Sequence, residues 1–65
     1  MDEKYKLIKP DAAADRIGLS ASTLAKLRMK RAGPPWVALG RSVRYRVADL
    51  DAWVEAHTIS TGPAA

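Results

Sequence analysis

The chain has 65 residues, a length that allows one domain and leaves little room for a deep substrate pocket. It contains no cysteine and one histidine, His57, which excludes disulfides, a cysteine nucleophile and a His/Cys zinc site. The net charge of +4 is concentrated in residues 26–46, which hold seven basic residues and no acidic one. Such a segment suggests a polyanionic partner such as nucleic acid, with a solvated surface as the alternative. No apolar run is long enough for a membrane span and the charged N-terminus is unlike a signal peptide, so we expect a cytoplasmic protein.

Residues 1–9 form a short lead-in, for which a strand and a packed extended segment are both open. Pro10 suits the first position of a helix, and Gly18 suits the left-handed residue that ends one. These residues predict a helix over residues 10–17.

Ser20 is a good N-cap, because its hydroxyl can accept a hydrogen bond from the backbone N–H of Ser22 or Thr23. A second helix is predicted over residues 21–31, ending at Gly33 before two prolines. Two short helices joined by a tight turn with glycine are typical of a helix-turn-helix. A small helical hairpin without a DNA-binding role is the alternative.

After the prolines, the hydrophobic period changes from helical to two. Residues 36–39 and 43–46 are predicted strands joined by a turn over residues 40–42. In this hairpin we expect Val43 and Tyr45 to face the core and Arg44 and Arg46 to face outward. A last helix is predicted over residues 48–57, with acidic residues in its first turn. Residues 10–57 therefore form the domain, and residues 58–65 are expected to be a flexible or docking tail. The predicted fold class is mainly α with a small β-hairpin, a winged helix-turn-helix.

The expected DNA-binding residues fall into two groups. On the second helix, a helical wheel and the N-terminal position select Ser20, Ala21, Ser22, Thr23, Lys26, Arg28 and Lys30. On the hairpin they are Arg41, Ser42, Arg44 and Arg46. For Arg28, and for Arg31 beyond it, a phosphate contact or a salt bridge is favoured over base readout. The alternative for the hairpin arginines is protection of an exposed sheet edge. Met29 lies on the same outward face of the second helix as Ser22 and Lys26, and the alternatives to a groove contact for it are a gap-filler against the core or against another subunit.

The expected core consists of large apolar side chains on the inner faces of these elements. Its members are Ile17, Leu19, Leu24, Leu27, Val37, Leu39, Val43, Tyr45, Leu50 and Trp53. Trp36 is also expected in the core, with base stacking as the alternative. We find no catalytic constellation, no metal site and no feature that indicates a cofactor or a small-molecule substrate.

Residues 7–57 resemble a known family. The features that carry the resemblance are Gly18-Leu19-Ser20 after two alanines, Ser22-Thr23-Leu24, Gly33 followed by Pro35, the segment Gly40-Arg41-Ser42-Val43-Arg44-Tyr45-Arg46, and Asp49-Leu50 with Trp53. The chain is similar to the small winged helix-turn-helix proteins of the MerR-like superfamily, in particular to the excisionases (recombination directionality factors) and the AlpA-like prophage regulators. Two positions depart from the family pattern. Lys9 stands where the family often has a capping Ser or Thr. Arg16 stands where it often has Leu, which leaves open an exposed Arg16 that contacts a phosphate or a partner.

The resemblance implies binding to double-stranded DNA, with the second helix in the major groove and the hairpin in the minor groove. It implies a protein without catalytic activity, of bacterial or phage origin, that binds side by side near an attachment site. Such a protein bends the DNA and helps a tyrosine integrase to excise a mobile element. Self-association on DNA could use the acidic last helix or the tail against a neighbour's basic face. Two alternatives are an AlpA-like transcription regulator on one operator and a module that binds an acidic protein.

Overall fold

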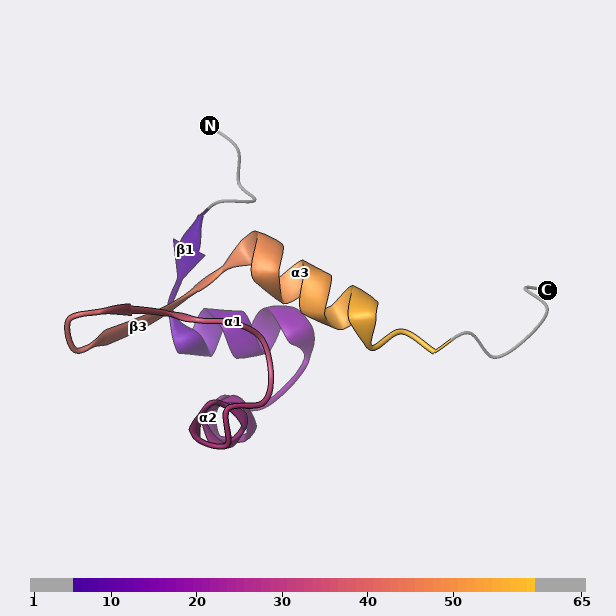
Figure 1. Cartoon of the computed structure of the whole chain (residues 1–65), viewed down its shortest axis with the longest axis horizontal. Coiled ribbons are helices and arrows are strands. Elements are labelled where there is room, and N and C mark those ends of the chain that lie inside the picture. The colour runs from indigo at the N-terminus through magenta and orange to yellow at the C-terminus, as the bar shows by residue number, and fades with distance from the viewer. Residues whose placement is uncertain (1–5, 60–65) are drawn as a thin grey trace.

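The computed structural model describes residues 6–59, which form three helices and three strands in the order β1-α1-α2-β2-β3-α3 (Figure 1). The bounds are β1 Leu7–Ile8, α1 Pro10–Ile17, α2 Ala21–Met29, β2 Val37–Leu39, β3 Ser42–Arg46 and α3 Val47–Ala56. In Figure 1 the view runs nearly along α2, whereas α1 and α3 lie across it, so α2 crosses α1 at a steep angle. This arrangement confirms the winged helix-turn-helix expected from the sequence.

Helix α1 has the predicted bounds, and backbone hydrogen bonds close both of its ends. Pro10 is in its first turn, and the Lys9 carbonyl accepts from the N–H of Ala13 at 2.9 Å without any side-chain cap. At the other end Gly18 is left-handed, with φ of 77°. The N–H groups of Gly18 and Leu19 donate to the carbonyls of Asp15 and Ala14, at 3.2 and 2.9 Å, and form a Schellman motif.

Helix α2 begins as predicted and ends two residues early. The Ser20 hydroxyl accepts from the N–H of Thr23 at 3.1 Å and caps the helix. At the C-terminus, the left-handed residue is Arg31, with φ of 58°, ahead of the predicted stop at Gly33. The N–H of Ala32 donates to the Leu27 carbonyl at 2.8 Å, so a second Schellman motif turns the chain away from the helix.

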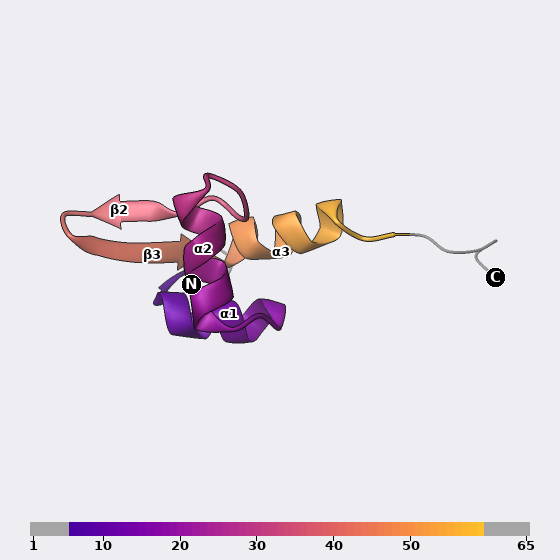
Figure 2. The same ribbon diagram turned by 90° about the horizontal axis from the view of Figure 1, so that it is seen from below.

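The sheet has the strand order β1-β3-β2, and both pairs are antiparallel. Val37 pairs with Arg44 and Leu39 with Ser42 in the predicted hairpin. Residues 7–8 are a strand, since Ile8 pairs with Tyr45 on the free edge of β3. In Figure 2 the β2–β3 hairpin extends beyond the helices on one side, and α3 extends in the opposite direction.

The core is a small cluster of residues from both helical and sheet elements. Its fully buried members are Ala13, Ala14, Leu24, Tyr45 and Leu50, with Ile8, Ile17 and Val43 packed against them. Of the residues predicted for the core, Leu24, Tyr45 and Leu50 are confirmed as fully buried, and Leu19, Leu27, Val37 and Trp53 are half-buried. The predictions missed Ala13 and Ala14, because small side chains bury completely where helices approach closely. They also missed Val47, which is the first residue of α3 and lay between the predicted strand and the predicted helix.

Two core predictions were wrong. Leu39 is 51% exposed, because β2 carries it out along the projecting hairpin beyond the helices. Trp36 is 43% exposed, because it precedes β2 beside the C-terminus of α2 and covers that edge of the domain without entering the core.

Helix α3 starts one residue earlier than predicted and ends at Ala56. His57 follows as the C-cap, with its Nδ1 2.8 Å from the Trp53 carbonyl, and Thr58 donates its hydroxyl to the Val54 carbonyl at 3.2 Å. The first residue of the predicted tail is thus bound to the helix end. Residues 1–5 of the predicted lead-in and residues 60–65 of the predicted tail lie outside the described residues.

Candidate nucleic-acid interface

The outward face of α2 is defined by the burial of Leu24 on the opposite side. Leu24 is fully buried against the core, which turns Ser22, Lys26 and Met29 to solvent. Met29 is 81% exposed, so it does not fill a gap in the core, and a groove contact or a contact with another subunit stays a prediction. The face therefore presents one cation, one hydroxyl and a flexible apolar side chain on a convex helix.

Three hydroxyl groups gather at the N-terminus of α2. Ser20 donates its hydroxyl to Thr23 Oγ1 at 2.8 Å, and the Oγ atoms of Ser20 and Ser22 are 3.3 Å apart. Ser20 also caps the helix, so its hydroxyl already has partners within the protein. Ala21, Ser22 and Thr23 are exposed beside it. With such short side chains, the backbone of this turn can approach a partner closely.

The hairpin brings two of its four predicted DNA-binding residues together at its tip. Arg41 and Ser42 are exposed at the turn, where Gly40 is left-handed with φ of 62°. Arg44, expected to face outward, is half-buried, and its guanidinium donates to the Val43 carbonyl at 2.8 Å.

Arg46 lies apart from the tip. It is the N-cap of α3, and its Nη1 is 3.4 Å from Asp49 Oδ2 in an ion pair. The three arginines therefore do not form one outward row along the hairpin. The sequence pattern missed this because α3 begins immediately after β3 and carries an acid three residues beyond Arg46.

Arg28 turns toward the sheet. Its Nη1 donates to the Tyr45 hydroxyl at 3.1 Å, and its guanidinium carbon lies 5.8 Å from the centroid of the Trp36 ring. This geometry is a cation–π contact combined with a hydrogen bond, and it joins α2 to β3. Of the two contacts expected for Arg28, the salt bridge to an acid is absent from residues 6–59, and the phosphate contact stays a prediction. Sequence reasoning missed the Tyr45 partner, because only the fold places β3 under the C-terminal half of α2.

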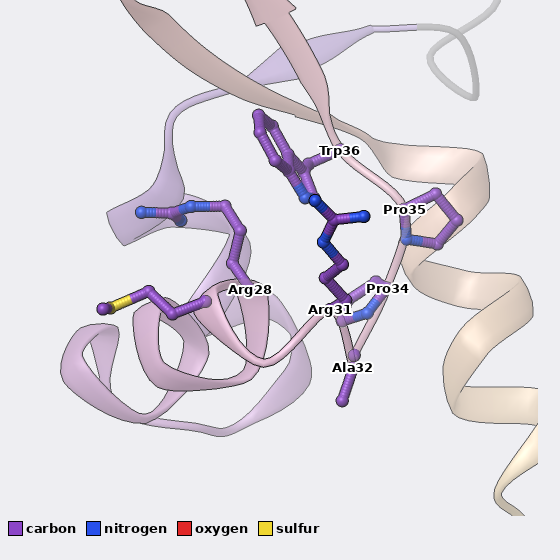
Figure 3. A pocket seen from close by; sticks show the side chains of 8 residues that line it. Arg28, Arg31, Ala32, Pro34, Pro35 and Trp36 are labelled. Atoms are coloured by element: carbon purple, nitrogen blue, oxygen red, sulfur yellow. The ribbon is translucent and has the colours of Figure 1, made fainter.

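A hollow of about 410 Å³ opens between the end of α2 and the start of β2 (Figure 3). The last turn of α2 and residues 31–36 form its lining, which is Arg28, Met29, Arg31, Ala32, Gly33, Pro34, Pro35 and Trp36. It has two guanidinium groups and no carboxylate in its lining. In the sequence, the only indication of this hollow is the segment Pro34-Pro35-Trp36, which follows shortly after Arg31.

The side of the domain formed by α1 and α3 has a different electrostatic character. Arg16 binds Asp51 through two hydrogen bonds of 2.9 and 3.0 Å, so one of the two departures from the family pattern is an ion pair between helices. The Arg16 guanidinium, mainly through these hydrogen bonds, lowers the pKa of Asp51 below its ordinary value. The sequence left open a phosphate or partner contact for Arg16, and the structure shows an intramolecular one.

The match of the chain to a known protein family agrees with this geometry. No curated protein matches the chain. Within residues 6–59, no helix is both long and apolar enough to cross a membrane. Residues 7–58 match the family model described as a helix-turn-helix domain, and this match covers β1, α1, α2, the hairpin and α3. The chain therefore belongs to the helix-turn-helix domain family, whose fold binds DNA.

Proposed function

We propose that the chain is a sequence-specific binder of double-stranded DNA that inserts α2 into the major groove and sets the β2–β3 hairpin against the adjacent backbone and minor groove. The observation that carries this proposal is the outward face of α2. Lys26 and Ser22 lie on the side opposite the buried Leu24, with short side chains at the N-terminal turn. A helix with such a face can approach base edges closely, and Lys26 can then reach a guanine or a phosphate.

The biological role that we propose is that of an excisionase, or recombination directionality factor. In this role the chain binds cooperatively near an attachment site, bends the DNA and promotes excision of a mobile element by a tyrosine integrase. The resemblance of residues 7–57 to the excisionases supports this role.

The C-terminal half of α3 is the surface that we propose for contacts between neighbouring copies. Of the acidic residues on α3, Asp49 and Asp51 already pair with Arg46 and Arg16 within the domain. Glu55 is exposed and makes no ion pair within residues 6–59, and Ile59 beyond it is 81% exposed. One acid beside an exposed apolar side chain can meet the basic face of a neighbour.

A gel-shift titration on a duplex of about 60 base pairs, taken from an attachment site or from upstream of the gene, tests the proposal at two salt concentrations. Successive retarded complexes that appear cooperatively and weaken with salt support the excisionase role. A single sharp complex would assign the chain to operator-binding regulators of the AlpA-like kind. No complex at low salt would overturn the DNA-binding proposal and leave an acidic protein as the partner of the basic face.

A matched pair of charge variants separates assembly from DNA contact. Glu55→Gln is expected to reduce the cooperativity of the ladder without weakening the first complex. Asp11→Asn makes the same change of charge on the exposed first turn of α1 and should leave the ladder as in the wild type. Equal cooperativity in both variants would contradict the role of α3 in assembly.

A further inference from the structure

The hollow between α2 and the hairpin contains nitrogen donors that the domain itself does not use. Arg31 is exposed, and neither its guanidinium nor the indole N–H of Trp36 has a partner within residues 6–59. Arg28 uses Nη1 for the Tyr45 hydroxyl and has further N–H groups beyond that bond. In Figure 3 the side chain of Arg31 points toward Trp36, and Arg28 lies on the other side of the ring.

These donors occupy the boundary between the two elements that we propose to contact DNA. Met29 belongs both to the outward face of α2 and to the lining of the hollow, so the hollow opens beside that face. Trp36 lies at the other rim and directly precedes β2 of the hairpin. A DNA strand that passes from the groove read by α2 to the groove met by the hairpin must cross this boundary with its sugar–phosphate backbone.

The backbone at Arg31 has an unusual conformation for an arginine. Arg31 is the only residue other than glycine with positive φ in residues 6–59, at 58°, and its N–H donates to the Arg28 carbonyl at 3.0 Å. A left-handed conformation is unfavourable for a side chain with Cβ and is usually occupied by glycine at this position of a Schellman motif. An arginine nevertheless occupies this position, and its side chain lines the hollow.

We propose that the hollow is an anchoring site for one backbone phosphate of DNA, bound by the guanidinium groups of Arg28 and Arg31 and by the indole N–H of Trp36. Two guanidinium groups and one N–H provide charge-assisted hydrogen bonds to phosphate oxygens, and no carboxylate in the lining competes for them. Tyr45 is a positioning residue, because its hydroxyl holds Arg28 against the Trp36 ring. The site rests on the proposed DNA-binding function and gives it a contact that is independent of base sequence.

Binding to a mixed-sequence duplex of roughly 20 base pairs, measured by fluorescence anisotropy over a salt series, tests the charge of the site. Arg31→Gln is expected to weaken binding roughly tenfold and to lower the salt slope by about one ion. Tyr45→Phe retains the charge of Arg28, so it should weaken binding without changing the slope. Arg16→Gln removes the same charge from the α1–α3 side and is the matched control, with no change in slope expected. Slopes equal to the wild type for both Arg31→Gln and Arg16→Gln would overturn the site.

Tryptophan fluorescence provides a readout that reports on the hollow itself. The chain has two tryptophans, so Trp53→Phe leaves Trp36 as the only reporter. With the short duplex in excess, so that each duplex carries one copy, bound duplex is expected to protect Trp36 from acrylamide. The Trp36→Phe protein, which reports through Trp53, should show no such protection under the same conditions. If the duplex binds and Trp36 stays as accessible as before, the phosphate site is wrong while DNA binding stands. If the duplex does not bind and polyglutamate protects Trp36, both proposals fall and the hollow takes an acidic protein.

Discussion

The arginines on the two sides of this small domain differ in whether they have acidic partners. On the α1–α3 side, Arg16 and Arg46 are neutralised by Asp51 and Asp49 at 2.9 and 3.4 Å. On the side formed by α2, residues 31–36 and the hairpin as far as Arg44, no basic residue has an acidic partner within residues 6–59. These basic residues are Lys26, Arg28, Lys30, Arg31, Arg41 and Arg44.

The difference shows that net charge alone describes this protein poorly. Four charges of the chain cancel in pairs on the side that we expect to face away from DNA. The six basic residues without an acidic partner lie on the side that carries the outward face of α2. A polyanion therefore meets a more strongly positive surface than the net charge of +4 suggests.

Both sides depend on one core, and Leu24→Ala tests this dependence with the largest effect on stability. Leu24 is fully buried, so its truncation should lower the free energy of unfolding by about 2–5 kcal/mol and unfold both sides together. Urea denaturation followed by circular dichroism measures the loss. Lys26→Ala on the exposed face of the same helix is the control and should change stability by less than about 0.5 kcal/mol. A loss of similar size in both variants would contradict the assignment of the faces of α2.

On the side that we propose to bind DNA, we expect Lys26 and Arg44 to act differently. Lys26→Ala should change sequence preference, with a loss of about 1–3 kcal/mol confined to preferred sites, because this side chain faces the groove. Arg44→Ala should weaken binding to all duplexes equally and lower the salt slope by about one ion. Competition binding between a selected site and a scrambled duplex measures both. An unchanged salt slope for Arg44→Ala would contradict its phosphate contact.

The glycine-containing turns before and after α2 provide the next comparison. Gly18 and Gly33 both have positive φ, at 77° and 81°. An added Cβ meets nothing within 4 Å at Gly18, but at Gly33 it comes 3.0 Å from the Leu27 Cβ. Gly18→Ala should therefore cost about 1–2 kcal/mol of stability from backbone strain alone. Gly33→Ala should cost more and should also weaken DNA binding, because residues 31–36 must shift. Thermal unfolding compares the two, and a smaller cost at Gly33 would contradict the tight packing against Leu27.

The smallest effect is expected at the ion pair of the other side. The pKa of Asp51 in the folded protein is lowered below its ordinary value of 3.8. The pair therefore stabilises the fold above pH 3.8, and this contribution is lost as the pH falls through the lowered pKa. Asp51→Asn should be slightly less stable than the wild type at pH 7 and equally stable at pH 2. A difference in stability that persists at pH 2 would assign the effect of Asp51 to something other than its charge.

The sequence predicted the elements of the fold well because their ends depend on local signals. Pro10, Gly18 and Ser20 are such signals, and each stands where the structure uses it. Contacts between distant segments could not be predicted. The pairing of β1 with β3, the Arg28–Tyr45 hydrogen bond and the exposure of Leu39 depend on how the hairpin lies relative to the helices. Arg31 shows the same limit, because nothing in its neighbours indicates that an arginine takes a left-handed turn before the available glycine.

The difference between the two sides can be tested most directly by NMR, with a titration of the ¹⁵N-labelled protein with duplex DNA. We predict that the amide shifts change at Ser22, Lys26 and Arg41 and at residues 31–36, while those of Arg16 and Asp51 stay as in the free protein. Changes centred on α1 and α3, with α2 and the hairpin unaffected, would contradict the account.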